Sequence, residues 1–299
     1  MQNKRYLFFS LLCLLLLKSC ASITEYPETR KVSQIDSFHG IEVEDPYRWL
    51  EDFTSEEVGT WVELQNDLSQ KYLTKNQYRK RIKENLESIW VSNSKSIPQI
   101  KGDHIFYFFN EGSWQQSKLM KQECDTCLPE VTIDPNTFSV DGTVSLSNLS
   151  ISPNGKFIAY SISDGGSDWK TWKVLDLETN QVLEDSIKWT KFSSGSWESD
   201  NSGFYYQKYP EPKEVALSEI NRSPKLYFHK IGTSQEEDLL VYERPDKPNW
   251  SWDVQVSEDG QYRILSVGEG TDDSNRLYIK FVNDSSFTPV VAELEATYI

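Results

Sequence analysis

The feature that most restricts the fold is a strand–turn–strand pattern that occurs three times in the second half of the chain. Residues 149–160 read LSISPNGKFIAY, and the pattern returns at 196–206 and 254–264. Its glycines, Gly155, Gly203 and Gly260, are 48 and 57 residues apart. Asn-Gly and Asp-Gly favour the positive φ angles of tight hairpins. A four-stranded unit of about 40–50 residues is typical of a β-propeller blade, and the regular period favours a propeller over a β-sandwich with similar hairpins.

Short strands and turns alternate from about residue 98 to the end, and no helical stripe reappears. Ten Trp and fifteen Tyr, against only two Met, favour a β-rich, aromatic-packed fold. The sequence predicts strands at residues 104–109, 144–149, 157–162, 172–177, 203–206, 225–229, 254–256, 264–267 and 277–282. We expect the chain to stop around the fourth blade, within an apparent blade pattern at residues 289–294.

Residues 26–90 instead predict helices separated by turns. Asp45-Pro46 is a helix-start signal for a short aromatic helix. Ser55 precedes a second helix with apolar residues at i, i+3 and i+4 spacing. A third helix carries Tyr78, Ile82, Leu86 and Ile89 on one side. The fold class we predict is therefore mainly β with an N-terminal helical segment.

The start of the chain predicts an export signal. A basic start is followed by an apolar run at residues 6–17, which is too short to cross a bilayer. The run ends in Leu-Lys-Ser-Cys, which resembles the lipobox of bacterial lipoproteins and would make Cys20 the lipidated residue, although Lys18 departs from that pattern. An ordinary secretory signal is the alternative. We expect a periplasmic protein, anchored to the outer membrane if Cys20 is lipidated.

These patterns divide the chain into a signal at residues 1–19, a helical segment at 20–90 and a propeller segment at 91–299.

The formal charge of −15 argues against nucleic acid as a partner, since phosphate binding needs clustered cations. Cys124 and Cys127 lack the further ligands of a zinc site. In an exported chain a local disulfide is favoured over free thiols or a redox or metal function.

No active-site motif is recognisable in the sequence. The chain has no Gly-x-Ser-x-Gly elbow, and Gly165-Gly166-Ser167 lacks the last glycine and lies between strands. The three histidines, His39, His104 and His229, have no paired ligand, and we expect no catalytic residue, metal or cofactor here. We interpret them as structural.

Several segments resemble the prolyl oligopeptidases, serine peptidases that cleave after proline. The most specific is DSFHGIEVEDPYRWLED at residues 36–52, followed by WVELQN at 61–66. The likeness continues along the propeller segment through SPNGKFIAY at 152–160, GSDW at 166–169, KFS at 191–193, SEDG at 257–260, EGTD at 269–272 and NRLY at 275–278.

The resemblance implies a seven-bladed propeller that caps an α/β-hydrolase domain, with the N-terminal helices packed on the hydrolase. The family's Ser, Asp and His triad lies in that hydrolase domain, so we expect this chain to be a fragment or truncated product with about four blades and no peptidase activity alone. The propeller would admit only oligopeptides. Phe192 matches an aromatic on the substrate side, with blade core as the alternative, and Thr271 matches a position near the same cavity. Gly268 stands where some members have a substrate-contacting Arg.

Two other functions fit the same patterns. One is a lipid-anchored propeller that binds a partner without catalysis. The other is an enzyme of the oligopeptidase B type, which cleaves after basic residues and shares the architecture. The denser match along the propeller favours the prolyl type. In each case we expect a monomer, with oligopeptides as the substrate of the complete enzyme.

Overall fold

The computed structural model describes residues 25–52, 55–212, 214–215 and 220–298, and it divides into two compact units, Met1–Trp90 and Val91–Ile299. The export signal and Cys20 lie outside the described residues. Within the described ranges, no helix has the length and apolar character needed to cross a bilayer.

The first unit begins with a hairpin that the sequence reading missed. Strands β1 (Ile35–Phe38) and β2 (Ile41–Glu44) pair antiparallel around His39 and Gly40, whose φ angles are 52° and 83°. The helical prediction for this part of residues 26–90 was therefore wrong. Ile41 and Val43 alternate with glutamates, a period-two pattern, and the two-residue turn with positive φ closes the hairpin.

Helices follow the hairpin, as the rest of the segment predicts. A single 3₁₀ turn, η1 (Arg48–Glu51), comes after Asp45-Pro46, and two α-helices follow, α2 (Glu56–Thr74) and α3 (Arg79–Trp90). Ser55 caps α2, since its hydroxyl accepts a 3.2 Å hydrogen bond from the backbone N–H of Val58. Val58 is the one buried residue of α2, and α3 has none.

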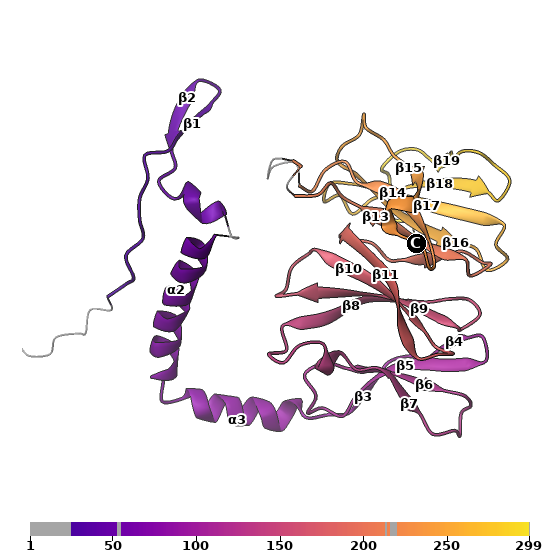
Figure 1. The fold of residues 1–299 in the computed structure, drawn as a ribbon, viewed down its shortest axis with the longest axis horizontal. Helices are drawn as coiled ribbons and strands as arrows, with labels where there is room; N and C mark the ends of the chain where they lie inside the picture. Colours follow the sequence, from indigo (N-terminus) through magenta and orange to yellow (C-terminus); the bar gives the residue numbers. More distant parts are fainter. Residues whose placement is uncertain (1–24, 53–54, 213, 216–219, 299) are drawn as a thin grey trace, which may run out of the picture. The chain divides into compact units, whose positions relative to one another are not determined.

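The second unit consists of four antiparallel meanders, which we call the first to fourth sheets (Figure 1). The first contains β3 (Ser94–Lys95), β4 (Gln99–Lys101), β5 (His104–Asn110), β6 (Lys118–Gln122) and β7 (Glu130–Ile133). The second contains β8 (Val144–Ile151), β9 (Phe157–Asp164), β10 (Lys170–Asp176) and β11 (Gln181–Thr190). The third contains β12 (Ser196–Trp197), β13 (Gly203–Lys208), β14 (Lys225–Lys230) and β15 (Leu239–Tyr242), and the fourth β16 (Trp250–Val256), β17 (Tyr262–Glu269), β18 (Arg276–Phe281) and β19 (Thr288–Val291). Short 3₁₀ turns, η2 (Pro135–Thr137) and η4 (Gln235–Glu237), lie in the connections.

This arrangement confirms the predicted partial propeller of about four blades. The second and third sheets are joined through one residue pair, Thr190 with Lys208, so they are separate meanders linked at an edge. Every predicted strand is present, usually longer by one or two residues, and 254–256 extends back to Trp250.

The apolar cores lie between neighbouring sheets, as face-to-face packing of blades requires. Between the first two sheets, Phe106 and Leu119 pack with Ile158 and its neighbours. The other two cores are strongly aromatic. Between the second and third are Ala159, Trp172, Val174, Ile187, Trp197, Phe204 and Tyr206. Between the third and fourth are Leu226, Trp250, Trp252, Val254, Leu265, Val267 and Tyr278.

The repeated turns contact one another from sheet to sheet. The N–H of Gly102 donates to the carbonyl of Pro153 at 3.2 Å, and the N–H of Asn154 donates to Asn201 Oδ1 at 2.9 Å. A Cβ on Gly155 would lie 2.3 Å from the carbonyl oxygen of Lys101. Gly155 of the sequence repeat thus permits both the positive φ of its turn and the close approach of two backbones.

Candidate functional site

One end of the four sheets gathers most of the residues that sequence reasoning singled out. In an antiparallel meander, the connection into the first strand and the turn between the second and third strands lie at the same end. This places four connections at one end: β11–β12 (residues 191–195), β9–β10 (165–169), β17–β18 (270–275) and the described part of β13–β14 (209–212, 214–215 and 220–224). Phe192 and Thr271 therefore share an end, although they belong to different sheets.

Lys191 is the buried cation of this end. Its side chain is 3% exposed, and its Nζ lies 3.8 Å from the ring centroid of Trp169 and 5.2 Å from that of Tyr209. The ammonium donates to the carbonyl of Ile220 at 3.2 Å and to the side-chain oxygen of Asn221. Burial lowers the pKa of Lys191, and the nearby charge of Asp168 offsets part of that effect.

Aromatic rings surround this cation. Trp169 meets Trp189 edge to face at 5.7 Å between ring centroids. Phe192 meets Tyr209 in the same manner at 6.3 Å, and burial raises the pKa of Tyr209 to about 12. Trp189 and Phe192 have φ angles of 60° and 48°, a conformation that bulky residues seldom adopt. The turn is held in this conformation by its surroundings, a pattern that is common at binding sites.

The surroundings that hold the turn are mostly hydrogen bonds to Gln207. Its backbone N–H donates to Ser193 Oγ at 3.0 Å, and its side-chain Nε2 donates to the carbonyl of Lys191 at 3.4 Å. Its Oε1 accepts from the N–H of Trp252 at 2.5 Å, which ties the turn to the fourth sheet. Ser194 also donates to Asp253 of that sheet. Burial raises the pKa of Asp253, while the bonds from Ser194 act against the rise.

The two predicted pocket residues, Phe192 and Thr271, are both exposed to solvent. Phe192 is 59% exposed, so its ring is not part of a described sheet core. Thr271 is exposed at the turn that follows Gly270, and in the described residues no hydrogen bond or ring contact joins it to Phe192. Gly268 lies in β17 opposite Ser251.

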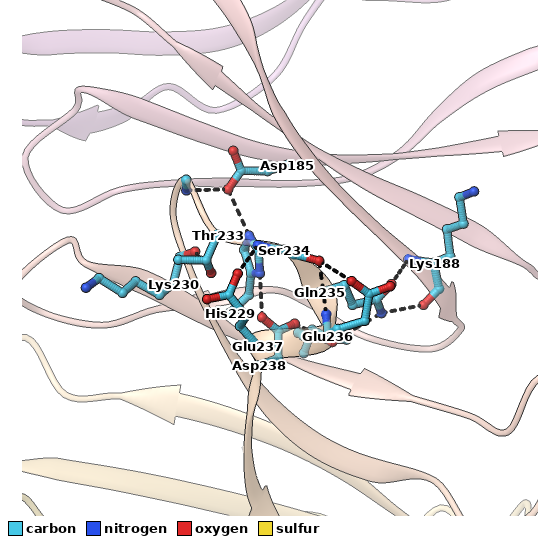
Figure 2. A network of polar contacts seen from close by, with 12 residues as sticks. Asp185, Lys188, His229, Lys230, Thr233, Ser234, Gln235, Glu236, Glu237 and Asp238 are labelled. Carbon is cyan, nitrogen blue, oxygen red and sulfur yellow. Dashed lines mark hydrogen bonds and ion pairs between the residues drawn. The ribbon is translucent and has the colours of Figure 1, made fainter.

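A second polar cluster, which sequence reasoning missed, surrounds His229 (Figure 2). Nδ1 of the ring lies 2.7 Å from Asp238 Oδ1, and Nε2 lies 2.8 Å from Asp185 Oδ1. The ring is fully buried, and both nitrogens are bound to carboxylates, so His229 cannot act as a general base. The three residues are 44 and 9 positions apart in the sequence, and no motif marks them as neighbours.

The comparison that decides the family covers nearly all the described chain. The family described as prolyl oligopeptidase, N-terminal beta-propeller domain, matches residues 26–299. The chain belongs to the prolyl oligopeptidase family.

Relatives agree with this assignment. A prolyl endopeptidase of Elizabethkingia miricola is 39% identical over 274 residues, which are 91% of this chain and 38% of that protein. The dual function macrocyclase-peptidase POPB of Galerina marginata is 31% identical over 306 residues, which cover 91% of this chain and 42% of that protein. A structure of prolyl oligopeptidase B from Galerina marginata, bound to a 25mer macrocyclization substrate, has a TM-score of 0.75 at 30% identity, covering 92% of this chain and 42% of that one. The chain thus spans about 40% of the length of the relatives it matches.

In the described residues of this member of the prolyl oligopeptidase family, His229 is paired with carboxylates and not with a nucleophile. There, no Ser, Thr or Cys side chain forms a hydrogen bond with a histidine, and no group of three His, Cys, Asp or Glu residues could hold a metal ion. An exposed aromatic face such as that of Phe192 can stack on a ring or on apolar groups of a ligand.

The predicted disulfide lies in the first sheet, far in sequence from Lys191 and Phe192. Cys124 and Cys127 form a disulfide in the turn between β6 and β7, with Cα atoms 5.0 Å apart. Gln122 supports the same turn, because its Nε2 donates to the carbonyls of Asp125 at 3.1 Å and Cys127 at 2.7 Å. The pair is therefore part of a small, locally braced loop.

Proposed function

We propose that this chain is the substrate-gating part of an exported serine endopeptidase that cleaves short peptides after proline. The observation that carries the proposal is the aromatic end built by Trp169, Trp189, Phe192 and Tyr209 around Lys191. Phe192 is 59% exposed and can offer a flat apolar face to a proline ring, while the partly exposed Trp169 and Trp189 and the buried Tyr209 support it. One named relative is a prolyl endopeptidase, and the structure of another, prolyl oligopeptidase B, contains a 25mer macrocyclization substrate.

The chemistry of the complete enzyme would come from a Ser–His–Asp triad outside these residues. The serine would attack the carbonyl carbon of the proline residue while the histidine takes the hydroxyl proton. The C–N bond then breaks, the leaving amine takes that proton, and water hydrolyses the acyl-enzyme. The groups of this chain would orient the peptide and limit access to short, flexible substrates. Phe192 and Thr271 would line the substrate side.

The decisive experiment is a peptidase assay on the product of the complete gene. We expect turnover of a chromogenic peptide with proline before the scissile bond, little turnover when arginine replaces the proline, and none from residues 1–299 alone. Preference for arginine would support the oligopeptidase B type instead. Lack of any activity, with no Gly-x-Ser-x-Gly downstream of Ile299 in the gene, would support a non-catalytic binding module.

Phe192 provides a residue-level test in the same enzyme. Replacing Phe192 by Ala should raise KM for the proline peptide by about tenfold, the order expected when one aromatic contact of roughly 1.4 kcal/mol is lost, with a smaller change in kcat. Leu128→Ala, at a residue 90% exposed in the β6–β7 turn, is the matched control and should leave KM unchanged. An unchanged KM in Phe192→Ala would remove this residue from the pocket.

The location is a separate proposal that rests on the leader. We propose export to the periplasm and lipidation at Cys20, with the outer membrane as destination. Growth with an alkyne-labelled fatty acid should label the wild-type protein and not Cys20→Ser, and fractionation should find the label in the outer membrane. A soluble, unlabelled periplasmic protein would indicate the ordinary secretory signal.

A further inference from the structure

The polar cluster around His229 connects two blades rather than residues of one. Asp185 belongs to β11, the last strand of the second sheet, while His229 belongs to β14 of the third. Asp238 follows η4, in the connection that leads from β14 to β15. Figure 2 shows the imidazole between the two carboxylates, with the 231–238 connection close to β11. One titratable ring therefore contributes to the contact between these sheets, beside their aromatic core.

The hydrogen bonds determine the protonation state of that ring. An ionised carboxylate only accepts hydrogen bonds, so a ring with a carboxylate on each nitrogen must donate from both and carry a positive charge. The other partners are donors as well. The N–H of Gly232 donates to Asp185 Oδ1 at 2.8 Å, and the hydroxyl of Tyr206 donates to Asp238 Oδ2 at 2.6 Å. The two carboxylates and one imidazolium leave one net negative charge, which these donors help to stabilise.

The side-chain amide of Gln235 also joins the 231–238 connection to β11, and an amide carries no titratable proton in this pH range. The Oε1 of Gln235 accepts from the backbone N–H of Lys188 at 3.0 Å, and its Nε2 donates to the carbonyl of Lys188 at 3.0 Å. The amide thus pairs with β11 much as a neighbouring strand would. The 231–238 connection is therefore fastened to β11 by one pH-sensitive and one pH-insensitive device.

We propose that Asp185, His229 and Asp238 form an alkali-sensitive clasp between the second and third sheets. The clasp is closed while His229 is an imidazolium. When the ring loses its proton, one carboxylate faces a nitrogen lone pair, and the 231–238 connection opens locally from β11.

The pH range of opening follows from the groups in the clasp. Burial alone would lower the pKa of His229, but the hydrogen bonds and charges of Asp185 and Asp238 outweigh it and raise the pKa from 6.5 to about 9. Such a group stabilises the closed state fully below pH 6.5 and loses that effect as pH rises to about 9, by roughly tenfold in the closing equilibrium per pH unit. Above that range its contribution is absent.

Other charged groups near the clasp do not reverse this direction. Burial and the bond to Asp238 raise the pKa of Tyr206 on β13, so its hydroxyl remains a donor over the whole range. Burial would raise the pKa of Asp185, but its bonds to His229 and Gly232 lower it below 3.8, so acid weakens the contribution of Asp185 only below that value. The remaining charges nearby are Lys188 on β11, Lys230 on β14, and Glu236 and Glu237 on η4.

The ring itself can be observed directly, because the chain has only three histidines. In His39→Gln/His104→Gln, nitrogen-15 NMR of labelled histidine reports His229 alone. We expect both ring nitrogens to be protonated at pH 7. The ring should lose one proton near pH 9, and the chemical shifts of both nitrogens should change with that midpoint. A neutral ring at pH 7, with one protonated nitrogen, would overturn the proposal. Asp238→Asn in this background should move the midpoint toward 6.5 by at least one pH unit.

Hydrogen exchange tests whether the titration opens the contact between sheets. After correction for the intrinsic base-catalysed rate, peptides from residues 181–190 and 231–238 should exchange roughly tenfold faster per pH unit between 6.5 and 9. Peptides from β16–β18 should not change and serve as the internal reference. Asp185→Asn, which keeps a hydrogen-bonding group, should exchange rapidly already at pH 7. A pH-independent rate in the wild type would refute the clasp, whether or not the variant folds.

Discussion

In the second unit, three apolar cores between four sheets bury most of their side chains almost completely, whereas in α3 of the first unit Ile82, Leu86 and Ile89 are each at least half exposed. Leu73, Ile82 and Leu86 line an open apolar hollow of about 560 Å³. Both units have regular apolar spacing in the sequence. The comparison teaches that periodicity specifies an apolar face, while burial requires a second face that fits it.

The largest expected effect lies in the aromatic core between the second and third sheets. Trp172 is fully buried there, so Trp172→Ala should lower the free energy of unfolding by roughly 3–5 kcal/mol. Denaturant titration followed by circular dichroism measures this. Trp172→Phe is the control, expected to lose less than about 1.5 kcal/mol, because it keeps a ring and removes an indole N–H that has no partner. A loss below about 1 kcal/mol for Trp172→Ala would show that this core does not carry the stability of the unit.

A smaller effect is expected at the repeated turns that join the sheets. Gly155→Ala should lower the free energy of unfolding by about 2–4 kcal/mol, since the residue has positive φ and its Cβ would overlap the backbone of residue 101. Gly165→Ala isolates the conformational part, because Gly165 also has positive φ but open space around it, and should lose only about 1 kcal/mol. Equal losses at both positions would mean that the close approach of turns contributes nothing. Both values come from the same denaturant titration.

The smallest effect is expected on the exposed helix of the first unit. Leu86→Ala in the 299-residue chain should change the free energy of unfolding by less than about 0.5 kcal/mol, because the side chain is half exposed and Ala favours a helix. Helical circular dichroism during thermal unfolding measures the change, and Lys80→Ala on the same helix is the control. A loss above about 2 kcal/mol would reveal that this face is covered, and would erase the contrast between the two units.

Local signals predicted the parts of the fold that depend on local chemistry. Asn154-Gly155 predicts its tight turn because the pair tolerates positive φ, and Ser55 predicts the start of α2 because its hydroxyl can cap a free N–H. The prediction was wrong where a short segment with strand spacing lies beside segments with helical spacing. Residues 35–44 were read with the helices around them, although Ile41 and Val43 alternate as in a strand. Strand β11 was not named, since Glu184, Asp185 and Lys188 interrupt its apolar pattern.

The candidate site divides in the same way. The likeness of Lys191-Phe192-Ser193 to a family motif drew attention to this turn, but not to its positive φ or to the rings of Trp169 and Tyr209 beside it. Those neighbours come from other connections, which meet only because antiparallel strands return the chain to the same end. The spacing of residues along the sequence does not show which connections become neighbours in the folded chain.

By itself the sequence determined the class of α2, α3 and nine of the strands and the repeat of about fifty residues, because turn propensity, capping and side-chain period act over a few neighbouring residues. Its motifs also indicated the family. Only the tertiary structure decided that His229 lies between two carboxylates, which raise its pKa to about 9. Burial and charge depend on which surfaces meet in space, and residues from different sheets become neighbours only after the chain has folded.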